Sequence, residues 1–223
     1  MSGFSDYIIY VHQYDDDENW KVLQFCIFDK RHYSEVVVPK IQQYKFKHFG
    51  HDGLVFGMGK ARGINQKKQR LDDINVVVEQ SNFVLIACLI NLKQLEAENI
   101  ADTQVQALEF GLVHAHRFLQ ERGQTDALTY VVSNSADVEQ KTFRAICEQN
   151  QDLPFELQVS DPHTKPLALQ FASALVPSII EQFQNPEAEN STFNILKNKF
   201  YCKGGRKQVG QGFEGWGLRQ FPD

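Results

Sequence analysis

Apolar residues along the chain gather into short runs of strand length, separated by longer stretches with helical spacing. Tyr7–Val11 and Phe83–Ile90 are continuous apolar runs rich in β-branched and aromatic residues. Such runs are typical of strands buried on both faces. The pattern predicts strands at 7–11, 22–28, 54–56, 83–90, 128–132 and 155–159, and helices at 33–48, 67–80, 103–122, 137–149, 167–184 and 190–200.

This order predicts the fold class. Two strands come first, a helix separates them from a third, and strands and helices then alternate strictly. Alternation of this kind favours an α/β fold with a mixed sheet flanked by helices on both faces. We expect residues 1–202 to form a single domain. Residues 203–223, which hold six of the fourteen glycines, are expected to form a tail packed on that domain.

Composition narrows the class of protein further. The chain has 223 residues, of which 42% are hydrophobic and 23% charged, so a core of normal size is expected. This excludes disordered, collagen-like and coiled-coil proteins. Its longest apolar runs fall short of the ~18 residues that a membrane span needs, and Met1–Asp6 has no signal-peptide pattern. The sequence therefore predicts a cytoplasmic protein that does not enter a membrane.

The common chemical motifs are missing. The four cysteines, at 26, 88, 147 and 202, show neither Cys-x-x-Cys spacing nor a Cys/His zinc pattern, so we expect buried, reduced thiols. The sequence also lacks a phosphate-binding Gly-Lys-Ser/Thr loop and a Gly-x-Ser-x-Gly nucleophile motif.

Positive charge is concentrated in one segment. Residues 40–70 hold eight Lys or Arg against one acid, Asp52, in a chain whose formal net charge is −5. One interpretation is a contact face for nucleic acid or for an acidic protein partner. The other is an ordinary solvated helix followed by a loop. The candidate contact residues are Lys60, Arg62, Lys67 and Lys68. A homo-oligomer is compatible with either interpretation.

Several sequence segments, in this order, resemble a bacterial and phage family described only as domain of unknown function 3800. The likeness extends over nearly the whole chain and is carried by Ser5–Val11, Phe25–Phe28, Phe46–Asp52, Phe83–Ala87, Ala107–Phe110, Leu169–Ala172, Gly215–Leu218 and Phe221–Pro222. The resemblance implies an RNase H-like fold, and with it divalent-metal chemistry on phosphodiester bonds.

The departures from that family fall on its acidic residues. The family's Asp-Glu-Ser-Gly-Asp motif aligns with 12–16, so its two leading acids are replaced by His12 and Gln13. A family Glu at the end of a strand aligns with Ser133, and an Asp on a late helix aligns with Ser173. The acids that the resemblance retains are Asp16, Glu109 and Asp161.

These replacements bear on the expected chemistry. Magnesium and manganese at a two-metal site require several convergent carboxylates, and Gln and Ser are weak substitutes. The sequence therefore predicts a catalytically degenerate RNase H-like protein that binds or regulates and carries no cofactor. Two alternatives stay open. One is a Mg- or Mn-dependent nuclease whose site is relocated to Asp15, Asp16, Glu109 and Asp161. The other is a structural subunit that partners an active paralogue.

Overall fold

A computed structural model describes residues 3–16, 19–50, 64–134, 138–151, 153–161, 165–204 and 209–222, and the statements below concern these residues. The strands are β1 (Phe4–Asp16), β2 (Trp20–Asp29), β3 (Phe83–Asn91), β4 (Leu128–Asn134), β5 (Phe155–Ser160) and β6 (Leu218–Phe221). The α-helices are α1 (Lys30–His32), α2 (Val38–Phe49), α3 (Ile64–Gln80), α4 (Ile100–Glu121), α5 (Gln140–Gln149), α6 (Leu167–Gln184) and α7 (Ser191–Leu196). A π-helical turn, η1 (Tyr33–Val37), joins α1 to α2, and two 3₁₀ turns, η2 (Leu92–Gln94) and η3 (Ala97–Asn99), precede α4.

The strands form one mixed sheet with the order β5-β4-β1-β2-β3-β6. The first three strands pair antiparallel, β4 and β5 run parallel to β1, and β6 runs parallel to β3. The predicted α/β class is therefore confirmed, and the arrangement is consistent with an RNase H-like fold. β1 and β3 both lie inside the sheet, as their apolar sequences predict.

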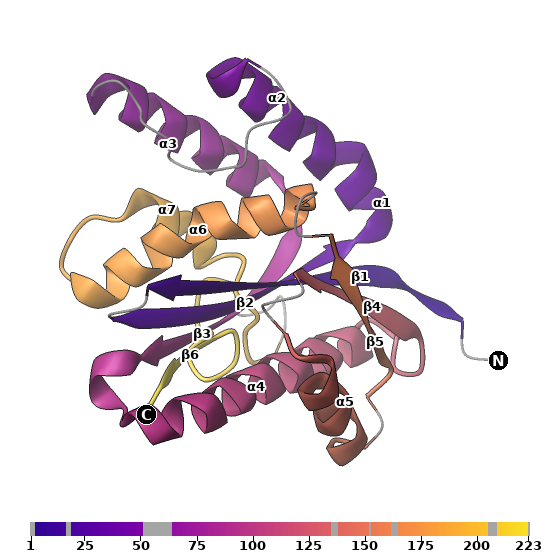
Figure 1. Cartoon of the computed structure of the whole chain (residues 1–223). Helices are drawn as coiled ribbons and strands as arrows, with labels where there is room; N and C mark the ends of the chain where they lie inside the picture. Colours follow the sequence, from indigo (N-terminus) through magenta and orange to yellow (C-terminus); the bar gives the residue numbers. More distant parts are fainter. Residues whose placement is uncertain are drawn as a thin grey trace.

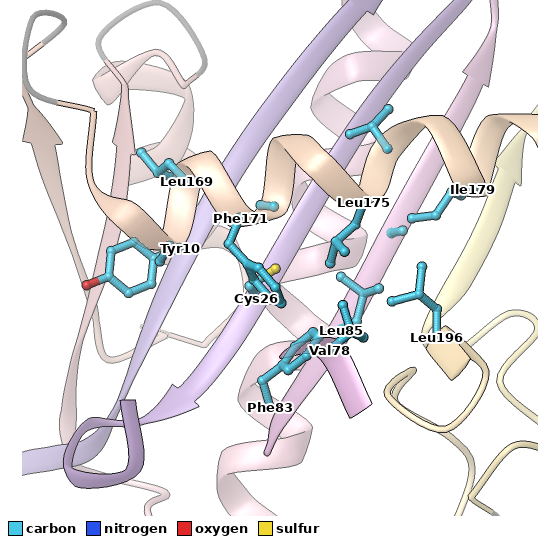
Figure 2. Close-up of a cluster of buried hydrophobic side chains, with 14 of the residues drawn as sticks. Tyr10, Cys26, Val78, Phe83, Leu85, Leu169, Phe171, Leu175, Ile179 and Leu196 are labelled. Atoms are coloured by element: carbon cyan, nitrogen blue, oxygen red, sulfur yellow. The ribbon is translucent and has the colours of Figure 1, made fainter. Parts of the chain in front are cut away.

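Helices cover the sheet on both faces (Figure 1). α2, α3, α6 and α7 lie on one face, and α4 and α5 lie on the other. Two hydrophobic cores result, which we call the α6-side core and the α4-side core. Figure 2 shows the α6-side core, in which Leu169, Phe171, Leu175 and Ile179 of α6 pack over the sheet. In the described part of the chain, no helix combines the length and apolar character needed to cross a membrane.

The C-terminal segments depart most from the sequence prediction. The helix expected over 190–200 ends at Leu196, because the chain then extends beside β3, where Leu85 N–H donates to Lys199 O and Tyr201 N–H donates to Leu85 O. The tail goes on to form the edge strand β6, which the sequence analysis did not predict. The short strand expected at 54–56 lies outside the described residues.

A glycine sets the distance between α4 and the sheet. Gly111 is buried in α4, and a β-carbon at this position would overlap the ring of Phe25 from β2. Phe25 is itself fully buried in the α4-side core. Glycine in a helix interior costs about 1 kcal/mol relative to alanine, so close packing is the compensating gain.

We therefore expect Gly111→Ala to destabilise the protein by about 1–3 kcal/mol despite its better helix propensity, because the methyl group overpacks the core. Chemical denaturation measures the change. The matched control is Gln106→Ala on the exposed face of the same helix, which is expected to change stability by less than about 0.5 kcal/mol. The Gly111→Ala/Phe25→Leu double variant should lose less than the sum of the two single losses. Strict additivity of the two losses would contradict this account of the contact.

Candidate functional site

His12 and Gln13, two neighbouring site residues predicted from the sequence, lie on opposite faces of the sheet. Side chains alternate along β1: Tyr10 belongs to the α6-side core, whereas Ile9 and Val11 belong to the α4-side core. His12 therefore lies on the face covered by α6. Gln13 opens into a cleft on the face covered by α4. Adjacent residues of a strand point to opposite faces of the sheet. His12 and Gln13 therefore cannot contribute to one site on one face.

His12 and Gln24 are buried polar residues on the face of the sheet that α6 covers. His12 pairs across β1 and β2 with Gln24, and the two side chains are 5% and 0% exposed. Ser173 lies half-buried on α6, above this same face. Both ends of the Gln24 amide lack a hydrogen-bond partner among the described residues. A buried amide without hydrogen-bond partners lowers the free energy of unfolding, so Gln24 is expected to destabilise the core.

Ser133 belongs to the opposite face. It is the parallel partner of Val11 and is fully buried, with its hydroxyl unpaired among the described residues. The Ser160 hydroxyl lies 3.1 Å from the Ser133 carbonyl oxygen and 2.9 Å from Asn134 Oδ1, so its single proton is shared between these two acceptors. These contacts tie together the carboxyl ends of β4 and β5.

The cleft on the α4 side has a volume of about 270 Å³ and lies at the carboxyl end of β1. Ligands of open α/β sheets commonly bind beyond the carboxyl ends of strands, where neighbouring connections diverge. Here β1 turns back into β2, while β4 leads towards α5. Among the described lining residues, Leu23, Ile90, Val105, Leu108 and Val138 supply the apolar surface, and Gln13, Lys21, Gln104, Glu139 and Thr142 supply the polar groups.

The charged groups of this cleft have partners. Lys21 Nζ lies 2.8 Å from Asp15 Oδ2, in a cross-strand pair at the β1–β2 hairpin. Glu139 precedes α5 and accepts a hydrogen bond from Thr142 Oγ1 at 3.0 Å. The sequence analysis missed Lys21, Gln104 and Glu139. Of these, Gln104 could have been found from its place in the first turns of a helix that follows a buried strand.

The two retained acids whose side chains are described, Glu109 and Asp161, do not form part of a metal-binding cluster. Asp16 ends β1, and its side chain lies outside the described residues. Glu109 accepts a hydrogen bond from Asn150 Nδ2 at 2.9 Å, at the far end of α5 from the cleft. Asp161 is exposed just after β5. Over the described ranges, no three His, Cys, Asp or Glu side chains are grouped so that they could hold a metal ion.

The basic segment is divided between the interior and the surface. Lys45 is 2% exposed and donates to Gln170 Oε1 at 3.2 Å, and Arg70 is buried with its guanidinium over the ring of Phe49. Lys47 pairs with Asp73 at 2.6 Å, a contact that lowers the pKa of this carboxyl. Lys67 and Lys68 lie exposed on α3. The eight cations therefore do not share one exposed face, and Lys60 and Arg62 lie outside the described residues.

The four cysteines are free and buried, as expected from their apolar sequence contexts. Burial raises the pKa of the Cys26 thiol to about 12, so this group is not a nucleophile at neutral pH.

Compared with known protein families and with curated proteins, the chain matches neither a family model nor a curated sequence. The geometry of its own residues is therefore the basis for any functional inference.

We expect Gln24→Leu to raise the free energy of unfolding by about 1–2 kcal/mol, because it replaces an unsatisfied buried amide with an apolar group of similar size. Urea denaturation measures the difference. Gln158→Leu on the exposed part of β5 is the control and should leave stability nearly unchanged. A clear loss of stability in Gln24→Leu would mean that the amide is hydrogen-bonded after all.

Proposed function

We propose that this chain is a binding module built on an RNase H-like scaffold that lacks metal-dependent nuclease activity. The ligand site is the cleft at the carboxyl end of β1. The four buried thiols fit a reducing compartment, and we propose a cytoplasmic location on that basis.

The composition of the cleft is the observation that carries this proposal. Two neutral amides, Gln13 and Gln104, and the ammonium of Lys21 face the cleft, while Glu139 is the carboxylate among its described lining residues. Lys21 and Asp15 neutralise each other, which leaves one carboxylate and two neutral amides, and these supply too little negative charge for a divalent cation. An apolar surface with a few oriented polar groups is instead typical of sites that bind organic ligands or partner side chains.

The relocated-nuclease alternative is less well supported. It would need Asp15 and Glu109 to act on one pair of metal ions, yet Asp15 pairs with Lys21 and Glu109 binds Asn150.

The structural-subunit alternative has no contact in the described chain to favour it. Size-exclusion chromatography of the chain alone would reveal self-association, which a subunit that assembles only with a paralogue should not show.

Two substitutions in the cleft should create the cation site that the parent lacks. Gln13→Glu and Gln104→Glu together would face Glu139 with two new carboxylates. We expect the double variant to bind Mn²⁺ at least about tenfold more tightly than the parent, because convergent carboxylates are its preferred ligands. Isothermal titration calorimetry measures the binding. The parent is expected to cleave neither RNA nor DNA in the presence of Mg²⁺ or Mn²⁺.

The matched control adds the same charge outside the cleft. Gln106→Glu with Gln120→Glu places two carboxylates on the exposed face of α4 and should leave Mn²⁺ binding close to that of the parent. Equal binding by the two double variants would show that the cleft side chains do not converge. Cleavage of nucleic acid by the parent, abolished by EDTA, would overturn the proposal and favour the metal-dependent nuclease.

The exposed lysines of α3 offer a separate contact for nucleic acid or an acidic protein. If Lys67 and Lys68 bind phosphates, Lys67→Ala/Lys68→Ala should weaken binding to an oligonucleotide several-fold and reduce its salt dependence. Fluorescence anisotropy at two salt concentrations measures both effects, with Lys141→Ala, at an exposed position of α5, as the control. Binding that is absent at low salt in the parent would leave an acidic protein as the candidate partner.

A further inference from the structure

A second cavity lies at the opposite end of the sheet from the cleft. Its volume is about 200 Å³, and its walls come from the start of β1, the end of β2, the start of β3, the end of α4 and residues 198–202. The cavity therefore exists only because the chain returns beside β3 after α7. Nothing in the proposed function uses this cavity.

Its walls are largely aromatic. Tyr7 and Phe118 meet edge to face with their ring centroids 5.4 Å apart, and Phe83, Phe200 and Tyr201 contribute further ring surface. Aromatic walls of this kind favour a planar apolar group, which they contact by stacking or by their edges. Sites for drug-sized ligands are typically larger, roughly 300–1,000 Å³, so this cavity suits a single substituted ring.

Both carboxylates that line the cavity are already bound. Asp29 Oδ1 accepts a hydrogen bond from the backbone N–H of His32 at 2.8 Å, where it caps α1. Glu121 Oε1 accepts one from the hydroxyl of Tyr201 at 2.8 Å. Burial and this carboxylate together raise the pKa of Tyr201, so its hydroxyl stays protonated and keeps donating at neutral pH.

The ammonium group of Lys199 also has hydrogen-bond partners within the protein. Its Nζ donates to the carbonyl oxygens of Glu79 and Ser81, at 3.1 and 2.7 Å, at the end of α3. These carbonyls are acceptors that a helix terminus leaves without partners, so the lysine serves as a cap. Its positive charge offsets part of the negative charge of Asp29 and Glu121.

Arg122 differs from these three groups. It lies half-buried at the end of α4, with its guanidinium over the ring of Phe118 at 5.2 Å. Within the described part of the chain, its head group has neither a hydrogen-bond acceptor nor a carboxylate within ion-pair distance. A guanidinium presents a planar fork of donors that matches a carboxylate, so Arg122 is the charged group of the described lining with donors still to satisfy.

We infer that this cavity binds a small aromatic carboxylate, with the acid group on the guanidinium of Arg122 and the ring against Phe118 and Tyr7. The two bound carboxylates, Lys199 and Arg122 leave the lining without a net charge. The anion is therefore selected by the fork of unsatisfied donors on Arg122, and the ring by the aromatic walls.

Phenylacetate and phenylacetamide form a matched pair of probes, since they share the ring and the number of non-hydrogen atoms and differ in charge. Titration of the whole chain, followed by protein NMR, should give a dissociation constant of roughly 0.1–1 mM for phenylacetate. Phenylacetamide should bind at least about tenfold more weakly. Shifted resonances should include those of Asn82 and Asn198, which line the cavity.

Arg122→Gln should weaken phenylacetate binding about tenfold and leave phenylacetamide binding unchanged. Arg144→Gln, on the exposed face of α5, is the control and should behave as the parent. Thermal melting establishes that each variant is folded, and Arg122→Lys, which keeps the charge without the fork, should bind with intermediate affinity. Equal affinity for the two probes, unchanged binding in Arg122→Gln, or no saturable binding of phenylacetate to the parent would each overturn the inference.

Discussion

The arrangement of this protein depends on β1, whose alternate side chains enter two separate cores. Tyr10 packs beneath α6, whereas Ile9 and Val11 pack against the α4 side. A slip of one residue would exchange the two sets, so burial on both faces fixes the register of the strand. The same constraint places His12 and Gln13 on opposite faces. A pair of acids at those two positions would likewise lie on opposite faces of the sheet.

Both candidate sites lie at ends of the sheet, where the helices stop covering it. At the carboxyl end of β1, the first turns of α4 and the start of α5 leave an apolar cleft edged by Gln13, Lys21 and Gln104. At the other end, the last turn of α4 and the segment after α7 enclose an aromatic cavity beside Arg122. The interior between them is closely packed, because Gly111 lets α4 approach the ring of Phe25.

The basic segment, residues 40–70, shows that a cluster of charges in the sequence need not form a charged surface in the folded protein. Eight cations within residues 40–70 suggest a basic surface, but the fold buries two of them and pairs a third with a carboxylate. Lys45 and Arg70 are buried, and Lys47 neutralises Asp73. Long side chains of this type bury their methylene groups against the core, so a local charge count overstates the charge that a partner meets.

The sequence by itself determined the α/β class, the interior positions of β1 and β3 and the span of α6, because continuous apolar runs and helical spacing are local signals. From a resemblance alone, it also led to the prediction that carboxylates are replaced at positions 12, 13, 133 and 173. The tertiary structure decided which of these residues share a face, because that depends on strand register and on where each helix packs. It also decided that residues 218–221 form a strand and that Arg122 meets Tyr7 and Phe118 at one cavity. β6 follows its partner β3 by more than 100 positions, and Tyr7 precedes Arg122 by more than 100, so no local pattern in the sequence encodes these contacts.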